Sequence, residues 1–476
     1  MSITHCGYVV KVKELRPHRN ADKLQIAKFF DCETCVGLDV KLGDMGIYFP
    51  SGLQLSEEFC AQNNLVRRKD ETGKNVGGYL EPDKRNIKTI RLRGEPSDGI
   101  FMTLDSVAYT GVDMSLLTEG AVIHELNGHE ICDKYIPKVK AHNEFNSPNR
   151  TRKNKPKNIP IAPLFNEHAD TEQLAYNLNA FKPGDEIEIT LKLHGTSQRT
   201  GYLPVLKGMK RTFWDKLFRR PGKPIYDWGY VTGTRRTVLD NFDGGFYGSN
   251  EFRESHAKFF EGKLHKGEEV FYEVVGFTTS GAPIMGSVSN KKLNDKEFER
   301  QYGPTTVFSY GCEPTGQREK FYRDEISIFS IPDPVPQSDF YVYRMTMTNE
   351  DGNVVEYTPD YMRYRCEQMG CKTVPVFEQF RIPDSNDRNI LYLNSEGIID
   401  YVTKTPGEWV MEAAETYYDG PDPIGKTHVR EGVVVRIVNR PSFTAYKHKN
   451  FAFKCLSGII TEEATNVADA DIASEM

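Results

Sequence analysis

An alternation of apolar and polar residues over positions 186–194 constrains the fold of this chain more than any other feature. Every second residue is aliphatic, and a period of two is typical of a β-strand with one buried face. Gly195 follows as a turn residue, and Lys192 and His194 share the polar face. A lysine on the polar face of a strand is ordinarily solvated, so Lys192 acquires a function only if partners gather around it.

The run Lys192-Leu193-His194-Gly195 resembles the nucleophile motif of polynucleotide ligases and capping enzymes, and this resemblance implies covalent transfer of a nucleotide to the lysine. A lysine amine attacks phosphorus only when it is neutral, and an ordinary lysine pKa of about 10.4 leaves roughly 0.1% neutral at physiological pH. Nearby cations and a bound metal ion lower such a pKa, because they disfavour the ammonium form. We therefore expect further lysines or arginines here, with carboxylates for a divalent ion and an aromatic ring for a base.

Candidate partners follow downstream. Arg235-Arg236-Thr237 comes after an apparent strand, and Glu273 lies in an apolar run where a carboxylate is costly to bury without a partner. An aromatic strand around Tyr343, the acid Glu431 before a valine run, and Lys447-His448-Lys449 come next. The two lysines of the last segment share one face, because residues two apart in an extended chain point the same way.

These segments resemble, in type and order, the motifs of the covalent nucleotidyltransferase superfamily, and most closely its nick-joining RNA ligases. The resemblance runs from about Phe181 to Leu456 and includes the Lys447-His448-Lys449-Asn450 element. It implies that the chain uses ATP, with Mg²⁺ or Mn²⁺ at the phosphates. The implied roles are Lys192 as nucleophile in a motif with His194 and Gly195, Arg236 on the nucleotide or nick, Tyr343 stacked on adenine, Glu273 on the ribose or metal, Glu431 on the metal, and Lys447 and Lys449 on the phosphates.

Each of these matches has an ordinary structural alternative when it is taken alone. An isolated glutamate in a strand is usually exposed, a single tyrosine is more often part of a core, and two lysines are more often a solvated edge. The order in which all of these residues occur together favours a functional site over the ordinary alternatives. Two positions stay open, because Tyr341 is expected to share the face of Tyr343, and Ser197 stands where the most similar phage-type pattern has asparagine.

The N-terminal 125 residues have short apolar runs broken by glycine, aspartate and proline, which is typical of a small all-β barrel. The segment from His18 to Ala27 resembles the opening of the tRNA-binding type of OB-fold module, with Arg19 where proline is common. An OB module ahead of the catalytic domain resembles one branch of the RNA ligases, often counted as the fifth family. Such surfaces often bind nucleic acid, and a structural barrel with no ligand is the alternative.

The expected fold class is α+β, with an N-terminal OB-like β-barrel before an ATP-grasp-like nucleotidyltransferase domain built on antiparallel sheets. The expected segments are an OB-like nucleic-acid-binding module over 1–125, a basic linker over 126–160, an adenylyltransferase domain over 161–460 and an acidic flexible tail over 461–476. Residues 201–228 are read as a basic insertion with interleaved aromatics, which is either a solvated hairpin or helix or an RNA-contacting loop.

Composition limits how the chain can bind RNA and in which cellular compartment it is expected. The formal net charge is -6, so any grip on RNA must be local. Nine cysteines at irregular spacing give no disulfide framework, and no signal peptide or long apolar run is visible. We expect a cytoplasmic monomer with reduced thiols and no membrane segment. Cys32 and Cys35 form the one tight cysteine pair, and without a second pair or clustered histidines zinc is not expected.

The sequence therefore predicts an ATP-dependent RNA ligase. Lys192 takes AMP from ATP, AMP passes to a 5′-phosphate, and a 3′-hydroxyl displaces AMP and closes the strand. The expected partner is RNA or a nicked duplex with an RNA 3′-end. The alternatives are an RNA-capping guanylyltransferase, which uses GTP and usually has aspartate in place of His194, a DNA ligase, which is expected to carry a C-terminal OB domain, and a non-catalytic RNA-binding adaptor.

Overall fold

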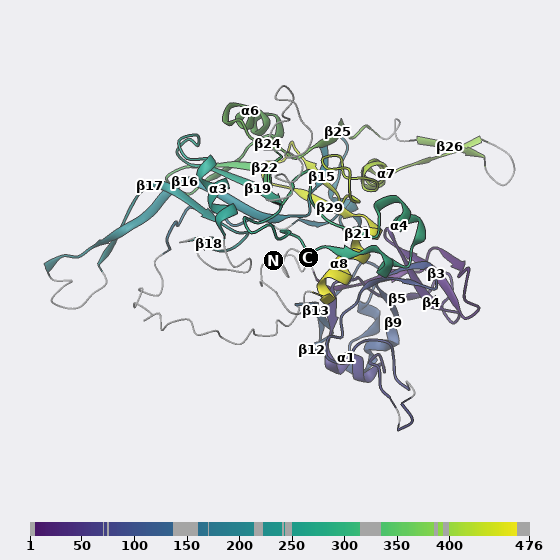
Figure 1. The fold of residues 1–476 in the computed structure, drawn as a ribbon. Helices are drawn as coiled ribbons and strands as arrows, with labels where there is room; N and C mark the ends of the chain where they lie inside the picture. The colour runs from purple at the N-terminus through teal and green to yellow at the C-terminus, as the bar shows by residue number, and fades with distance from the viewer. Residues whose placement is uncertain are drawn as a thin grey trace, which may run out of the picture. The chain divides into compact units, whose positions relative to one another are not determined.

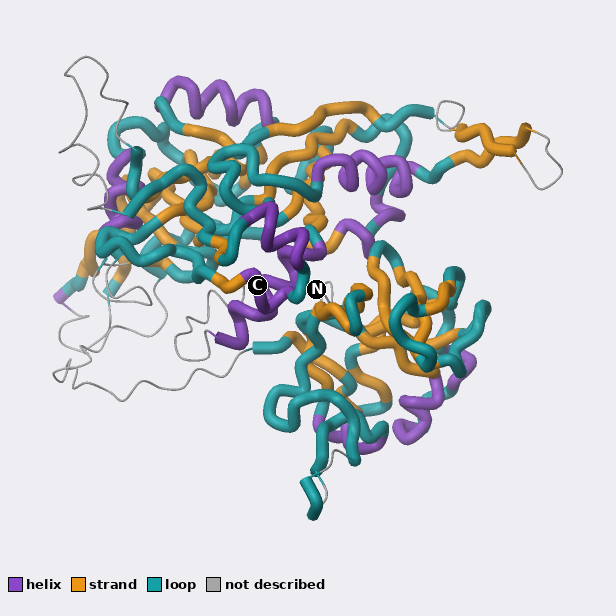
Figure 2. Tube along the Cα trace, turned by 45° about the vertical axis from the view of Figure 1, so that its right-hand side comes forward, coloured by secondary structure: helices purple, strands orange, loops and turns teal. Residues whose placement is uncertain are grey.

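The computed structural model describes residues 5–69, 71–73, 76–136, 160–169, 171–213, 222–239, 242, 250–314, 335–384, 389–393 and 399–463. These residues form a mixed α+β protein whose sheets are mainly antiparallel (Figures 1 and 2). Two compact units divide the chain: unit 1 is Met1–Val139, Val288–Thr305 and Phe451–Met476, and unit 2 is Lys140–Ser287 and Thr306–Asn450. Most of the expected linker (137–159) and of the expected acidic tail (464–476) lies outside the described residues. Within the described ranges, no helix is long and apolar enough to span a membrane.

A five-stranded sheet of unit 2 contains the predicted lysine strand, which the structure confirms. The sheet order is β14 (Glu172–Gln173), β29 (Ala445–Lys449), β28 (Gly432–Ile437), β15 (Glu186–Lys192) and β25 (Val376–Arg381). β14 runs parallel to β29, and the other neighbours are antiparallel. Ile187 and Ile189 of β15 are buried with Val433 and Val435 of β28 under helix α7 (Pro406–Tyr417). Burial of this apolar face is what the alternation in the sequence encodes.

A second, larger sheet of unit 2 follows directly. Its order is β18 (Val238–Leu239), β17 (Lys223–Gly233), β16 (Thr196–Lys210), β19 (Glu268–Gly276), β22 (Ser338–Thr348) and β23 (Val354–Glu356), and β24 (Lys372–Thr373) pairs with β22. Helix α3 (Glu251–Phe259) contacts β16, and helix α6 (Pro359–Met369) contacts β22. The chain passes from β15 to β16 through residues 193–195, so the lysine strand ends where the chain changes sheets.

The basic insertion is a long hairpin of β16 and β17 as far as the described residues show it (Figure 1). Pairing runs from Arg199 opposite Gly233 to Lys210 opposite Lys223. Phe213, near its end, is 73% exposed, and residues 214–221 lie outside the described part. A shorter hairpin joins β26 (Asn389–Leu393) to β27 (Ile399–Thr403). The hairpin shape agrees with the expected solvated hairpin, and RNA contact there stays a prediction.

Unit 1 is made of short antiparallel pairs around one apolar core. One sheet has the order β10 (Val122–Ile123), β1 (Gly7–Lys11), β5 (Met45–Phe49) and β9 (Ile100–Thr103), and another has β2 (Leu15–Pro17), β3 (Leu24–Phe29) and β4 (Cys32–Gly37). The two-stranded pairs are β6 (Leu53–Leu55) with β13 (Cys132–Lys134), β7 (Thr89–Leu92) with β8 (Glu95–Asp98), and β11 (Glu125–Leu126) with β12 (His129–Glu130). The helices are α1 (Glu57–Gln62), α4 (Lys296–Tyr302) and α8 (Phe451–Glu463).

The remaining elements are short. Two-residue strands are β20 (Val288–Ser289) and β21 (Thr305–Thr306). Turns of 3₁₀ helix cover Leu104–Thr110, Met114–Leu116, Leu174–Tyr176, Leu178–Ala180 and Asn290–Leu293.

The described sheets of unit 1 do not close into the predicted OB-like barrel. β4 and β8 lie side by side, but side chains replace the ladder between them. Thr34 Oγ1 donates to the carbonyl oxygen of Asp98 at 2.6 Å, and the backbone N–H of Cys35 donates to Ser97 Oγ at 3.1 Å. These side chains take the backbone groups that ladder bonds would need, so the sheet stays open at this seam.

The structure assigns no disulfide to the cysteines of the chain. All nine are free thiols. Cys32 is buried and its Sγ donates to Asp98 Oδ2 at 3.2 Å, whereas Cys35 is half-buried. The described residues contain no group of three or more His, Cys, Asp and Glu side chains that could hold a metal ion.

Candidate active site

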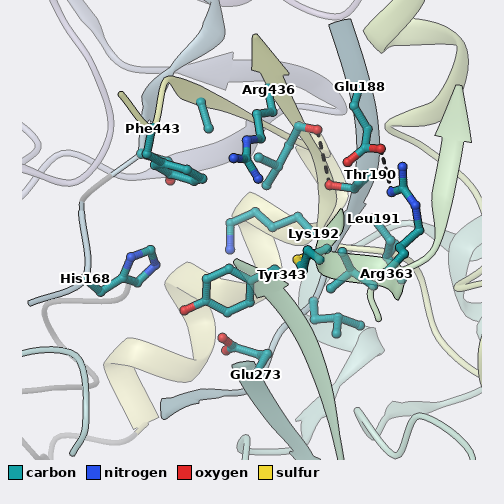
Figure 3. A pocket seen from close by; sticks show the side chains of 16 residues that line it. His168, Glu188, Thr190, Leu191, Lys192, Glu273, Tyr343, Arg363, Arg436 and Phe443 are labelled. Atoms are coloured by element: carbon teal, nitrogen blue, oxygen red, sulfur yellow. Dashed lines mark hydrogen bonds and ion pairs between the residues drawn. The ribbon is translucent and has the colours of Figure 1, made fainter. Parts of the chain in front are cut away.

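The change of sheets after β15 fixes the surroundings of Lys192. Gly195 lies at the crossing, where a Cβ would clash with the carbonyl oxygen of Val274 and approach Glu273 Cγ to 2.9 Å. The backbone N–H of Gly195 donates to Glu273 Oε1 at 3.1 Å. Glycine therefore permits the crossing segment to lie close to β19. The same hydrogen bond holds the carboxylate of Glu273, which is labelled in Figure 3.

A buried carboxylate joins two lysines at the end of β15. Glu431 Oε1 lies 2.9 Å from Lys192 Nζ and 3.0 Å from Lys449 Nζ. Strand register explains this, because Lys192 pairs with Gly432 and Gly432 pairs with Lys449 across three neighbouring strands. The Glu431 side chain is 2% exposed and that of Lys192 is 20% exposed. Burial raises the pKa of Glu431, but the two ammonium groups outweigh it and hold that pKa well below its ordinary value.

The tight packing of these strands also depends on a glycine. Gly432 has a φ of +146°, and a Cβ there would clash with the carbonyl oxygen of His448. The valine run after Glu431 therefore begins with a residue that lets β28 lie against β29 at the point where Glu431 meets the lysines.

Lys447 lies two residues before Lys449 on β29. Burial, together with the positive charges of Lys449, Lys192 and Arg235, lowers the pKa of Lys447 to about 7. His448, between the two lysines, is 3% exposed. The segment thus gathers cations at the lysine site, as a nucleotidyl-transfer site requires.

His194 supports this cluster through a contact with the Glu431 carboxylate. It is not among the residues that line the cavity described below. Its Nδ1 lies 3.5 Å from Glu431 Oε2, and its backbone N–H donates to the Tyr310 hydroxyl at 2.7 Å. The ring packs edge-on against Phe308 at 4.7 Å. Burial lowers the pKa of His194 although Glu431 acts to raise it, so the neutral imidazole supports the carboxylate without adding a full charge.

A cavity in unit 2 lies beside Lys192, lined by both sheets and by α6 (Figure 3). Leu191, Met362 and Val434 supply apolar wall, and the Lys192 amine points into the space beside Tyr343 (Figure 3). Glu273 lines the same cavity. The cavity therefore combines apolar walls with convergent polar and charged side chains, as small-molecule sites do.

Tyr343 reaches the cavity through a β-bulge. The ladder between β19 and β22 shifts register between Phe271 and Tyr272, which leaves Tyr343 as the extra residue. Its hydroxyl shares a hydrogen bond with Ser197 Oγ at 3.2 Å. Tyr341, expected on the same face, is 6% exposed and does not line the cavity. Of the two tyrosines, only Tyr343 therefore lines the cavity.

Arg236 is exposed and does not line the cavity. Its neighbour Arg235 is half-buried, and the carbonyl oxygen of Arg235 accepts a hydrogen bond from the backbone N–H of His168 at 3.2 Å. The charge of Arg235 acts on both His168 and Lys447. The structure therefore brings Arg235, and not Arg236, toward the lysine cluster.

His168 is a cavity residue that the sequence did not indicate (Figure 3). Its ring centroid lies 5.2 Å from that of Tyr343 and 5.9 Å from that of Phe271. Burial and the charges of nearby residues, Arg235 foremost, lower the pKa of His168 well below its ordinary value, so the ring is neutral. It lies in an irregular segment without periodicity, which offers no signal to a reading of sequence alone.

Glu188 and Arg363 form another wall of the cavity. The sequence analysis did not identify either residue as part of the site. An Arg363 guanidinium N–H donates to Glu188 Oε2 at 2.6 Å, and the amide of Gln379 donates to the same oxygen at 2.6 Å. Glu188 is 3% exposed. It shares the polar face of β15 with Lys192, so the same alternation that indicated the lysine could have indicated Glu188.

Glu273 and Glu431, the two predicted metal ligands, fit the binding of a divalent ion only in part. Mg²⁺ in nucleotide sites is commonly held by one or two carboxylates together with phosphate oxygens. Glu273 lines the cavity and can offer a carboxylate oxygen there. Glu431 is bound by Lys192 and Lys449, so a cation at this carboxylate competes with two ammonium groups.

Comparison with known proteins relates the fold to solved RNA ligases. No protein-family model matches the chain, and a search of curated proteins also finds no match. A lysine-to-methionine variant of the Naegleria gruberi RNA ligase with AMP and Mn has a similar fold: 15% sequence identity, 94% of this chain and 97% of that chain covered, and a TM-score of 0.51. A glutamate-to-alanine variant with AMP and Mn, and the ligase with PPi, each give 14% identity, the same coverage and a TM-score of 0.50. The likeness spans nearly the whole of both chains and shows a shared fold.

Proposed function

We propose that this protein is an ATP-dependent RNA ligase that forms a lysyl-AMP intermediate on Lys192. The observation that carries the proposal is the pairing of Lys192 and Lys449 with the buried Glu431 beside a cavity that also holds Glu273 and Tyr343. The similar fold of an RNA ligase solved with AMP and Mn supports it. ATP and Mg²⁺ or Mn²⁺ are the proposed cofactors.

In the first step the Lys192 amine forms a P–N bond to the α-phosphorus of ATP, and the P–O bond to pyrophosphate breaks. The amine must lose a proton before it attacks. Burial and neighbouring cations lower the pKa of Lys447 to about 7, and Lys447 is therefore proposed as the acceptor of that proton. The incoming phosphates then stabilise the protonated Lys447, since anions favour the ammonium form.

The other residues position the nucleotide. Tyr343 offers a ring for the base, and Ser197 orients that ring through its hydroxyl. Lys449 balances charge that builds on the phosphate oxygens. A bound Mg²⁺ would polarise the phosphate oxygens. Glu273, which lines the cavity, would supply a carboxylate oxygen to it, and Glu431 would do so only once Lys192 or Lys449 releases it.

Unit 1 is proposed to act as the OB-like nucleic-acid module of the branch often counted as the fifth RNA ligase family. The OB-like motif from His18 to Ala27 and the position of the N-terminal segment of this unit ahead of Lys192 support this assignment. The preferred substrate is then a nick in a duplex with an RNA 3′-end. A 2′-hydroxyl is the local group by which a protein tells RNA from DNA.

Label transfer tests the chemistry. The pure protein is incubated with Mg²⁺ and each α-labelled nucleoside triphosphate, and labelled protein is sought on a denaturing gel. We expect label from ATP and none in Lys192→Ala. Label from GTP in place of ATP supports a capping enzyme, and no label from any nucleotide supports the RNA-binding adaptor.

Joining assays test the substrate. Four nicked duplexes combine RNA or DNA on either side of the break. We expect the duplexes with an RNA 3′-end to be sealed far faster than the all-DNA nick. Equal rates on all four would exclude an RNA ligase even if Lys192 carries AMP.

A further inference from the structure

Unit 1 carries a concentration of positive charge that the chain as a whole lacks. Between Asn64 and Arg93 the sequence has nine lysines and arginines against four acids, while the whole chain has a net charge of -6. Eight of these cations are described, and five of them lie on or beside one loop and are here called the basic surface: Arg67, Arg68, Lys69, Lys84 and Lys88. They belong to neither the ATP cavity nor the predicted OB strand motif.

The loop that carries Arg67, Arg68 and Lys69 is held at both ends by buried residues. Leu65 and Leu80 are each 6% exposed and belong to the apolar core of unit 1. Val66 forms a parallel bridge with Leu80, and the backbone N–H of Arg67 donates to the Leu80 carbonyl oxygen at 2.9 Å. Figure 1 shows the loop projecting beyond α1. The base of the loop is therefore held in one conformation while its arginines face solvent.

Two glycines make this anchoring possible. A Cβ on Gly77 would clash with the carbonyl oxygen of Val66, and one on Gly78 would clash with that of Leu65. The returning segment of the loop can then lie against the outgoing one, with Gly78 N–H donating to the Val66 carbonyl oxygen at 3.0 Å. Arg67, Arg68 and Lys69 are all exposed at the start of this loop.

The second part of the surface brings further cations to Arg67. Lys84 and Lys88 share a single acid, Glu81, with each Nζ 3.5 Å from a carboxylate oxygen. Burial lowers the pKa of Lys88, and Lys84 and Arg67 lower it further against the attraction of Glu81. Three cations thus lie close enough to repel one another around one carboxylate, an arrangement that a bound anion relieves.

An exposed aromatic ring lies within the same loop. Tyr79 is 52% exposed, and its carbonyl oxygen accepts a hydrogen bond from Arg67 Nε at 2.8 Å. Cations interleaved with an exposed aromatic ring are typical of surfaces that bind nucleic-acid strands, because the cations meet phosphates and the ring meets a base. Arg85, in contrast, is used within the fold, since its guanidinium donates to the carbonyl oxygens of Leu55 and Pro82.

We propose that the basic surface binds the sugar-phosphate backbone of the RNA substrate. This deepens the proposed function, on which it rests for the identity of the polyanion, by naming a nucleic-acid contact on unit 1 outside the strands of the predicted OB motif. The surface contributes affinity and no chemistry, so its loss leaves nucleotide transfer to Lys192 intact.

The test compares two full-length variants with the same loss of charge. One carries Arg67→Gln, Lys84→Gln and Lys88→Gln, and the control carries Lys13→Gln, Lys41→Gln and Lys296→Gln, three exposed cations elsewhere in unit 1. Binding of a fluorescent nicked RNA duplex is measured by anisotropy from about 50 to 200 mM salt. Each lost phosphate contact reduces the slope of log affinity against log salt by roughly 0.9, so we expect a reduction of about 2 to 3 and weaker binding by tenfold or more.

Several results decide the proposal. Equal affinity and slope in both triple variants would overturn it, as would preferential binding of polyglutamate over RNA by the wild type. Arg67→Lys keeps the charge but loses the hydrogen bond to Tyr79, and it should retain the wild-type slope. Label transfer from ATP is measured alongside: its absence in the wild type defeats the proposed ligase function, while the RNA binding measurement still tests this surface.

Discussion

Lys192 and Lys449 share one carboxylate, so the loss of either should destabilise the protein far less than the loss of both. In Lys192→Met, Glu431 keeps Lys449 at 3.0 Å, and in Lys449→Met it keeps Lys192 at 2.9 Å. Each single variant therefore retains a paired carboxylate. We expect each to lower the free energy of unfolding by about 1 kcal/mol, as for a partly exposed ion pair.

The double variant removes both lysines from a carboxylate that is 2% exposed. Leaving a buried charge without its partner costs about 3–5 kcal/mol. At pH 7 this penalty has an upper limit, because the carboxyl group can take up a proton instead of staying charged. Protonating a carboxyl group with an ordinary pKa of about 4.3 costs about 3.7 kcal/mol at pH 7. We expect the double variant to lose about 3–3.7 kcal/mol, roughly 1–2 kcal/mol more than the two single losses together.

The pH dependence of this loss has a definite sign. In the wild type the folded pKa of Glu431 is depressed, so its contribution is present above the unfolded pKa and is lost as pH falls through the folded pKa. Without the lysines, burial raises the pKa of Glu431 instead, and the penalty should shrink between pH 7 and pH 5. Urea unfolding of all four proteins at both pH values measures it. Additive losses, or a penalty that grows at pH 5, would refute the shared-carboxylate reading, and adding Glu431→Gln to the double variant should recover stability.

Four further outcomes are expected. Lys192→Arg should fold but take no label from ATP, because a guanidinium does not lose its proton to become a nucleophile; label in this variant would move the nucleophile elsewhere. Gly195→Ala should lose label transfer by tenfold or more and about 1–3 kcal/mol of stability, because its Cβ clashes with the next strand; normal activity would show that the crossing relaxes freely. Lys447→Met should reduce label transfer by about 10² and change its pH profile near pH 7, and an unchanged profile would exclude Lys447 as proton acceptor. Asp98→Ala should lower unfolding stability by about 3 kcal/mol because Lys454 lies 2.8 Å from this buried carboxylate, and a loss below about 1 kcal/mol in thermal unfolding would contradict that.

Local pattern was enough to predict the strand that carries Lys192. Alternation has a period of two only in extended chain, so the lysine strand and its buried face follow from residues 186–194 alone. The shared face of Lys447 and Lys449 follows for the same reason. The barrel prediction for unit 1 was not confirmed, because side chains of Thr34 and Ser97 take the place of ladder bonds, and such substitution leaves no mark on hydrophobic periodicity.

By itself the sequence determined which side chains are present, their order, and which of them share a face within a strand. Only the tertiary structure decided which ones meet. Register across three strands brings Glu431 between Lys192 and Lys449, although it lies far from the first in sequence. A one-residue bulge selects Tyr343 over Tyr341 for the cavity. Both results depend on pairing between strands, and pairing is set by the packing of whole sheets, which a single strand cannot encode.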